Sequence, residues 1–117
     1  MTIRRIKTGK RMSQAVVHGG TVTTAGQVAQ KAGGESTAAQ TKDILREIDE
    51  LLAEAGTDKS RLLSATIWLV NMNNFAEMNS VWDEWVVPGA TPTRACVESK
   101  LAAPQFSVEI AVVAAVD

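Results

Sequence analysis

Apolar residues recur at helical spacing over residues 36–56, where they fall three or four positions apart and would line one face of an α-helix. Ser36 is a residue type that caps helix N-termini, and Gly56 is one that ends helices in a left-handed conformation. Because the pattern and both end signals agree, residues 36–56 are predicted to form a long helix. Its apolar positions are Ile44, Leu45, Ile48, Leu51, Leu52 and Ala55.

A second helix is predicted over residues 73–86, where apolar and aromatic side chains again follow helical spacing. Asn74 and Glu77 stand three residues apart at its start, which is the spacing of a capping residue and its reciprocal partner. Pro88 follows the pattern and is expected to end the helix. The stripe of this helix contains Phe75, Met78, Trp82 and Trp85.

Six further segments carry alternating or β-branched apolar residues, which is the pattern of strands. The pair Gly19-Gly20 predicts a tight hairpin between the second and third segments, and a turn at residues 99–105 is expected between the last two. Helices separate the third, fourth and fifth strands, so part of the sheet is expected to be parallel. The strands are predicted within residues 2–6, 12–20, 21–26, 62–70, 93–98 and 106–113.

The resulting order, β-β-β-α-β-α-β-β, predicts an α+β fold with a mixed six-stranded sheet and two helices on one face. The other face is left open and still carries apolar residues, which predicts self-association. Side chains alternate along a strand, and within residues 93–98 we assign the less polar set to the core. The opposite set is therefore expected on the open face with one carboxylate of the last strand: Arg94, Cys96, Glu98 and Glu109.

The composition excludes several classes of protein. The 117 residues are 45% hydrophobic and 21% charged, with a net charge of −1, which is typical of a single globular domain over residues 1–117 and offers no electrostatic case for nucleic acid or a membrane surface. Cys96 is the only cysteine and His18 the only histidine, so neither a disulfide nor a cysteine- or histidine-cluster metal site is expected. No run approaches the roughly 18 apolar residues of a membrane span, and no signal-peptide pattern is present, so we expect a cytoplasmic protein.

Four short motifs occur in order along the chain. They are Ala-Gly-Gln at 25–27, Phe-Ala-Glu-Met-Asn at 75–79, Thr-Arg-Ala-Cys-Val-Glu at 93–98 and Val-Glu-Ile at 108–110. In combination they resemble the Rid (reactive intermediate deaminase, YjgF-like) family. The similarity extends from residue 13 to residue 115 with the same order of elements.

The resemblance implies a chorismate-mutase-like fold and a homotrimer whose open sheet faces close into a central barrel, with active sites in clefts between subunits. It implies hydrolysis of reactive enamines and imines, such as 2-aminoacrylate, to 2-keto acids and ammonia, without a metal or organic cofactor. By this resemblance Arg94 binds the carboxylate of the imine or keto acid, and Glu109 handles the attacking water. Gly26, Asn79 and Cys96 match positions that line the family's cleft and contact the substrate.

Two positions depart from the family pattern. Many members carry a tyrosine before the Ser-Gln or Val-Gln of the second strand, where this chain has Met12 and contains no tyrosine at all. Ala25 stands where the family has a small polar residue before the glycine. These differences concern the identity of the substrate and leave Arg94 in place.

Each candidate residue also has a purely structural interpretation. The planar fork of Arg94 matches a carboxylate, but it could equally form an ion pair with Glu98 or Glu109. Glu109 could deprotonate a water, or pair with a basic residue across an interface. Cys96 has no histidine base to activate it, so we interpret it as a small wall residue whose backbone carbonyl could hold the water. Gly26 could mark a plain bulge instead of a close approach to a ligand.

Two classes of function therefore stay open. The first is an enamine/imine deaminase, and the second is a non-catalytic protein that holds a small carboxylate or keto acid as a regulatory ligand in the same cleft. Glu109 distinguishes them, because a carboxylate-binding protein needs the arginine but no acid that handles water. Asn79 contributes to either class if it faces the cleft, and to neither if it is simply solvated.

Overall fold

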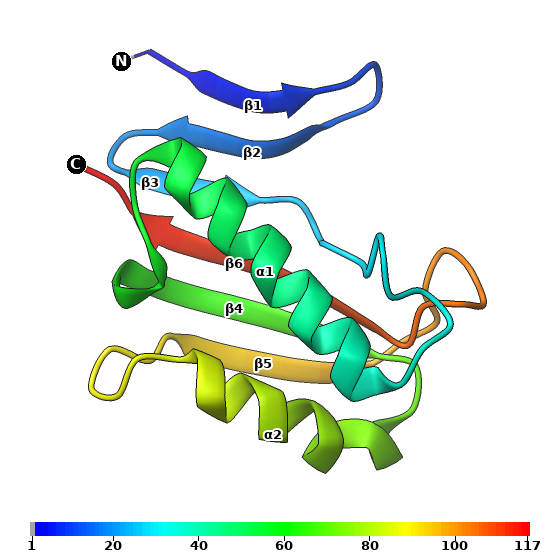
Figure 1. The fold of residues 1–117 in the computed structure, drawn as a ribbon. Helices are drawn as coiled ribbons and strands as arrows, with labels where there is room; N and C mark the ends of the chain where they lie inside the picture. The colour runs from blue at the N-terminus through cyan, green and yellow to red at the C-terminus, as the bar shows by residue number, and fades with distance from the viewer. Residues whose placement is uncertain (1) are drawn as a thin grey trace.

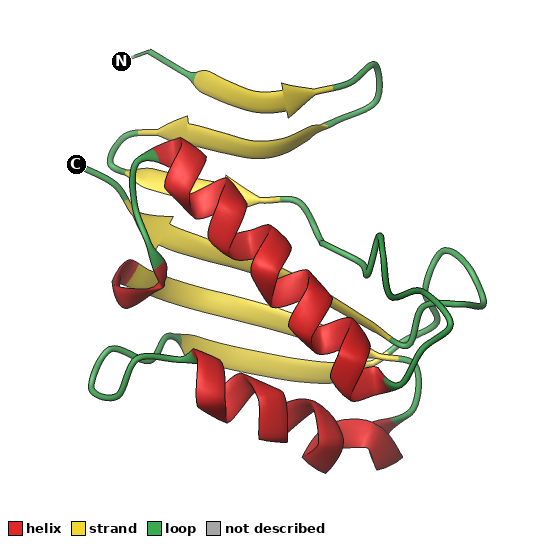
Figure 2. Ribbon diagram, in the orientation of Figure 1, coloured by secondary structure: helices red, strands yellow, loops and turns green. Residues whose placement is uncertain are grey.

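The structure is a computed structural model that describes residues 2–117, and it contains one six-stranded sheet with two α-helices on one face (Figures 1 and 2). The predicted α+β architecture is therefore confirmed. The strands are β1 (Arg4–Thr8), β2 (Ser13–His18), β3 (Thr21–Thr24), β4 (Leu62–Leu69), β5 (Thr93–Glu98) and β6 (Val108–Ala115). The helices are α1 (Thr37–Ala55) and α2 (Phe75–Trp85), with short 3₁₀ turns η1 (Lys59–Arg61) and η2 (Met72–Asn74).

The strand order is β1-β2-β3-β6-β4-β5, and the last strand of the chain lies in the middle of the sheet. The pair β4–β5 is parallel, as expected for strands joined through a helix, and the remaining pairs are antiparallel. Residues 99–107 connect β5 to β6 without a helix, as expected, but the two strands are not neighbours in the sheet, because β4 lies between them. β6 takes the inner position because alternate residues of this strand are almost completely buried: Val108, Ile110, Val112 and Ala114.

The helix ends follow the sequence signals at both ends of α1 and at the C-terminal end of α2, which stops at Trp85 before Pro88, but not at the N-terminal end of α2. The Ser36 hydroxyl accepts a backbone N–H of the first turn at 3.1 Å, and Gly56 ends α1 with a φ of 90°. Asn74 makes no capping bond with its side chain. Glu77 instead accepts the N–H of Ala38 at 2.7 Å and thereby ties the first turn of α2 to the start of α1. Within residues 2–117, no helix is both long and apolar enough to cross a membrane.

The core lies between the sheet and the two helices. Ile44, Ile48 and Leu52 of α1 are completely inaccessible, as are Ile67 of β4 and Ile110 of β6. The three α1 residues belong to the apolar stripe predicted for residues 36–56, which confirms the helical period of this segment. The helices cover only one face, and the opposite face of the sheet is left open (Figure 2).

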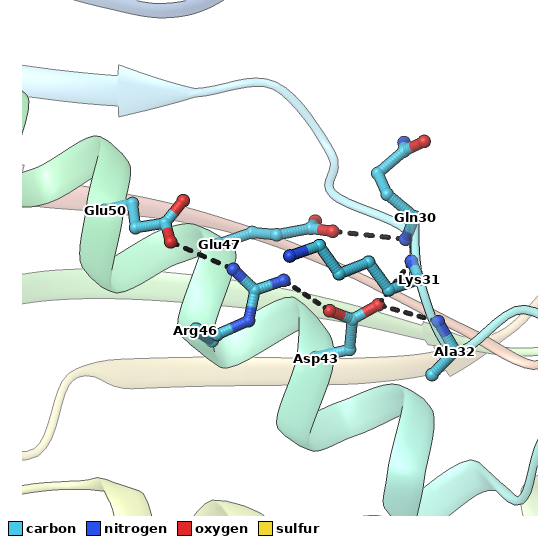
Figure 3. Close-up of polar contacts among 7 residues, drawn as sticks. All are labelled: Gln30, Lys31, Ala32, Asp43, Arg46, Glu47 and Glu50. Atoms are coloured by element: carbon cyan, nitrogen blue, oxygen red, sulfur yellow. Dashed lines mark hydrogen bonds and ion pairs between the residues drawn. The ribbon is translucent and has the colours of Figure 1, made fainter.

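Asp43 of α1 anchors the segment that leads from β3 to this helix (Figure 3). One oxygen of its carboxylate accepts the N–H groups of Lys31 and Ala32 at 2.8 and 3.0 Å, and the other accepts a bond from Arg46 at 2.6 Å. Burial opposes ionisation, but the Arg46 guanidinium and the two N–H donors together hold the pKa of Asp43 below its usual value. The ionised carboxylate therefore ties this segment to α1.

We expect Asp43→Asn to lower the free energy of unfolding by about 1–3 kcal/mol at pH 7, because the amide can satisfy only part of this network. Urea unfolding measures the change. The matched control is Glu50→Gln, which removes the exposed partner of the same Arg46 and should cost less than about 0.5 kcal/mol. Equal unfolding midpoints for Asp43→Asn and the wild type would contradict the anchoring role.

The same network predicts a dependence on pH. The folded pKa of Asp43 is depressed, so its stabilisation is fully present above the unfolded value of 3.8 and is lost as the pH falls through the folded pKa. The difference in the free energy of unfolding between the wild type and Asp43→Asn should therefore stay constant between about pH 5 and 7. It should narrow as the pH falls through the acidic range in which Asp43 takes up a proton. Acid titration of both proteins in urea checks the trend.

Candidate active site

Arg94 on β5 extends over α2 and is held there by three side chains. Its Nη1 donates to the Asn79 Oδ1 at 2.7 Å. Its guanidinium carbon lies 5.6 Å from the centre of the Phe75 ring and 5.4 Å from that of Trp82, distances at which a cation is attracted to an aromatic face. We call Arg94, Asn79, Phe75 and Trp82 the arginine cluster. The cluster orients the guanidinium while using one of its five N–H donors.

No acidic side chain neutralises Arg94 within the described residues 2–117. Neither of the two carboxylates that the sequence offered as structural partners pairs with Arg94. Glu98 accepts the N–H of Met72 at 2.9 Å, and Glu109 lies on another part of the sheet. A partly buried, oriented arginine without a counterion is an arrangement suited to an anionic ligand, and a carboxylate matches its remaining donors.

Cys96 lies two residues along β5 from Arg94 and packs against the core. Burial raises the pKa of its thiol, and the nearby Arg94 charge only partly offsets this effect. The thiol is therefore protonated at neutral pH and is a poor nucleophile. This agrees with the interpretation of Cys96 as a wall residue beside the arginine cluster.

Glu109 of β6 lies directly against Gly26, and we call these two residues the glutamate cluster. A Cβ added to Gly26 would come within 2.0 Å of the Glu109 Oε2 and 2.8 Å of its Cδ. Gly26 thus allows a close approach, as the sequence suggested, but the approaching group is a side chain of the same protein, which a larger residue at position 26 would displace. Burial raises the pKa of Glu109 above its usual value, which moves this carboxylate toward the range of a general base.

Arg94 and Glu109 lie on opposite faces of the sheet, which corrects the prediction that one open face carries both. The buried Ala65 of β4 pairs with Arg94 in the parallel register, and paired residues on neighbouring strands point to the same face. Arg94, and with it Cys96, therefore faces the helices. Glu109 pairs with Trp68, which belongs to the alternate set of β4 and faces away from them.

The prediction failed because β5 is an edge strand on which the small apolar residues are the exposed set. Its burial alternates, with Arg94 and Cys96 partly covered and Ala95 and Val97 exposed. Glu98, the last residue of β5, accepts a hydrogen bond from the backbone of η2. The prediction that the less polar residues of this strand face the core is therefore wrong. Arg94 takes the helix side because α2 offers its guanidinium better partners than water does.

The sequence predicts Phe75 and Trp82 only as members of the apolar stripe of the second helix, whereas in the structure both rings contact the Arg94 guanidinium. The signal that marks them is the position of Asn79, which lies four residues after Phe75 and three before Trp82 on the same stripe of α2. A polar residue in the middle of an aromatic stripe indicates a polar partner there. Met12, which stands at the family's tyrosine position, is 47% exposed in the loop before β2.

Comparison with known proteins finds relatives that match nearly the full length of this chain. The family model described as Endoribonuclease L-PSP matches residues 2–116. A RutC family protein of Haemophilus ducreyi is 44% identical over 98% of this chain and 97% of its own length, and the RutC family protein YoaB of Escherichia coli K12 is 42% identical over 99% and 100%. The crystal structure of NMB1025, a YjgF family member from Neisseria meningitidis, superposes with a TM-score of 0.96 at 45% identity, covering 100% of this chain and 97% of that one. With the family's fold, its motifs and full-length similarity all present, the chain belongs to the YjgF/Rid family.

Proposed function

We propose that this protein is an enamine/imine deaminase that hydrolyses 2-aminoacrylate-type intermediates to 2-keto acids and ammonia. The observation that carries this proposal is Arg94, an oriented guanidinium without a counterion. The carboxylate of a 2-imino acid supplies the missing charge and can accept two parallel hydrogen bonds. Asn79 holds the fork in one orientation, so the reacting carbon is placed at a defined distance from it.

Glu109 supplies the base in this mechanism. The enamine first takes a proton from solvent at its terminal carbon, which gives the iminium form of the 2-imino acid. The Glu109 carboxylate takes a proton from a water molecule as the oxygen attacks the iminium carbon, and a neutral tetrahedral carbinolamine forms. Glu109 then returns this proton to the nitrogen, and the carbon–nitrogen bond breaks as the hydroxyl oxygen forms the carbonyl of the keto acid. The hydroxyl proton is taken up by the departing ammonia, which leaves as ammonium. The raised pKa of Glu109 suits both halves of this exchange, since the group must accept a proton and then return it.

The two clusters belong to opposite faces of one sheet, so a single chain cannot direct them at one substrate. We propose that a homotrimer completes the site by bringing the arginine cluster of one copy against the glutamate cluster of the next. The open face supports this arrangement, because Val97, Trp68 and Glu109 are neighbours across β5, β4 and β6 on that face. Val97 is 45% exposed, so this row presents apolar surface around Glu109 that a second copy would cover.

A second candidate function is the binding of a small carboxylate or keto acid without turnover. The feature that favours it is that the arginine cluster lies entirely within one chain and does not involve Glu109. In that case pyruvate would bind through Arg94, and the wild-type protein would not accelerate imine hydrolysis. An assay with enzymatically generated 2-aminoacrylate, together with calorimetric titration of pyruvate, separates the two functions.

We expect Arg94→Ala to lower kcat/KM for 2-aminoacrylate about 30- to 1000-fold, because a charge-assisted bidentate contact in a desolvated cleft contributes roughly 2–4 kcal/mol. Arg94→Lys should recover only part of this loss, since an ammonium group lacks the planar fork. Cys96→Ala is the matched control on the same strand and should keep most of the activity. Full activity of a folded Arg94→Ala protein would rule out the carboxylate contact.

We expect Glu109→Gln to lower kcat by about 100-fold or more while pyruvate still binds, because the amide keeps the shape but cannot accept the proton. Gly26→Ala should lower kcat at least about tenfold, because the new Cβ displaces the Glu109 carboxylate from its position. Gly9→Ala is the control, because its added Cβ would lie 3.5 Å from the Met12 carbonyl oxygen, an ordinary contact. If Gly26→Ala and Gly9→Ala turn over equally fast, Glu109 does not act from this position.

The intersubunit site predicts complementation between two inactive variants. In trimers assembled from equal amounts of Arg94→Ala and Glu109→Gln chains, about a quarter of the sites should combine an intact arginine with an intact glutamate. The mixture should therefore regain roughly that share of wild-type activity, measured after denaturation and joint refolding. Sedimentation equilibrium provides the control for assembly. A monomer at micromolar concentration, or mixed trimers as inactive as the separate variants, would contradict the shared site.

A further inference from the structure

A separate polar cavity lies between α1 and the β1–β2 edge of the sheet. Its volume is about 370 Å³, which is within the range of small-ligand sites. It is far from the arginine cluster in the strand order, since β1 and β5 are the two opposite edges of the sheet (Figure 1). The side chains that decide its chemistry are Lys7, Gln14, Gln27, Gln30, Lys31 and Glu47.

Glu47 brings an unsatisfied acceptor to this cavity. Its Oε1 accepts the N–H of Gln30 at 3.1 Å, whereas its Oε2 is buried and has no hydrogen-bond partner among residues 2–117. Burial raises the pKa of this carboxyl, and the single N–H of Gln30 only partly offsets the effect. Buried carboxylate oxygens nearly always have a donor in native proteins, so the position calls for a bound group that carries one.

The cations of the cavity are not all equivalent. Arg46 is already neutralised, because it bonds Asp43 at 2.6 Å and Glu50 at 2.9 Å. Lys7 and Lys31, in contrast, form no ion pair with any described residue. Figure 3 shows Lys31 extending from its loop toward α1, on the side of Glu47 and Arg46. The cavity therefore combines one unsatisfied anionic oxygen with two uncompensated ammonium groups.

Lys7 is held in an unusual backbone conformation at this wall. Its φ is 50°, in the left-handed region that a residue with a side chain seldom adopts. In the β1–β2 register Ile6 pairs with Ala15 and Thr8 with Ser13, while Lys7 has no Cα partner. Strained residues of this kind concentrate at binding sites, where the surrounding structure maintains them.

We propose that this cavity binds a small zwitterion, a free α-amino acid. The ammonium group of the ligand donates to Glu47 Oε2, and its carboxylate lies at the lysine side, between Lys7 and Lys31. Leu51 is buried beneath the cavity and closes its floor, and the glutamine amides complete a polar wall. A ligand with only one of the two charges would leave either the buried oxygen or the lysines unsatisfied.

The test uses L-norvaline and two analogues that each lack one charged group. Pentanoate has the same carbon chain without the ammonium group, and butylamine has it without the carboxylate. Proton–nitrogen correlation NMR of the whole protein follows the side-chain amides of Gln14, Gln27 and Gln30, so binding at Arg94 is recognised separately. We expect saturable shifts of these amides with norvaline, and at least about tenfold weaker binding of both analogues.

A pair of matched variants locates the contact. Glu47→Gln removes the charge that receives the ammonium group and should weaken norvaline binding about tenfold or more. Glu54→Gln, on the same helix but outside the cavity, should leave the affinity unchanged. The proposal is overturned if norvaline binds no better than pentanoate and butylamine, or if the shifts occur only around Arg94. The comparison of the three ligands needs no variant, so it holds even where a substitution impairs folding.

Discussion

The alternation of side chains along β6 is the constraint on which the rest of the structure depends. Every second residue of this strand is buried under α1, and the strand can fill that role only in the middle of the sheet. The same alternation sends Glu109 to the opposite face, where Gly26 leaves room for its carboxylate. Packing of the core and presentation of the candidate base are therefore two consequences of one strand geometry.

The arginine cluster shows how a charge can be kept partly buried without an acidic neighbour. Two aromatic faces and an amide oxygen stabilise the guanidinium of Arg94, but none of them neutralises it. An ion pair to Glu98 would have satisfied Arg94 and removed its affinity for an anion. Because Glu98 is engaged by the backbone of η2 instead, the positive charge is available to a ligand.

The sheet separates two kinds of chemistry that the proposed reaction requires together. Arg94, the candidate carboxylate-binding residue, lies on the helix side of β5, and the candidate water-handling group lies on the open side of β6. Self-association would join them and cover apolar surface around Trp68 and Val97 in the same step. In this proposal, assembly and catalysis depend on one surface, so a mutation that weakens the contact between copies would also reduce turnover.

Local interactions made much of this protein predictable from its sequence alone. The boundaries of α1, its Ser36 and Gly56 caps, and the six strands depend on neighbours a few residues apart, so period and end signals identified them. The motifs also identified Arg94, Asn79, Glu109 and Gly26 as candidates. Only the tertiary structure decided that β6 lies between β3 and β4, that Arg94 faces α2, and that Gly26 makes room for Glu109. Those features depend on pairing and burial between segments far apart in the chain. At the edge strand β5, the contacts that α2 offers to Arg94 outweighed the preference of apolar residues for the core.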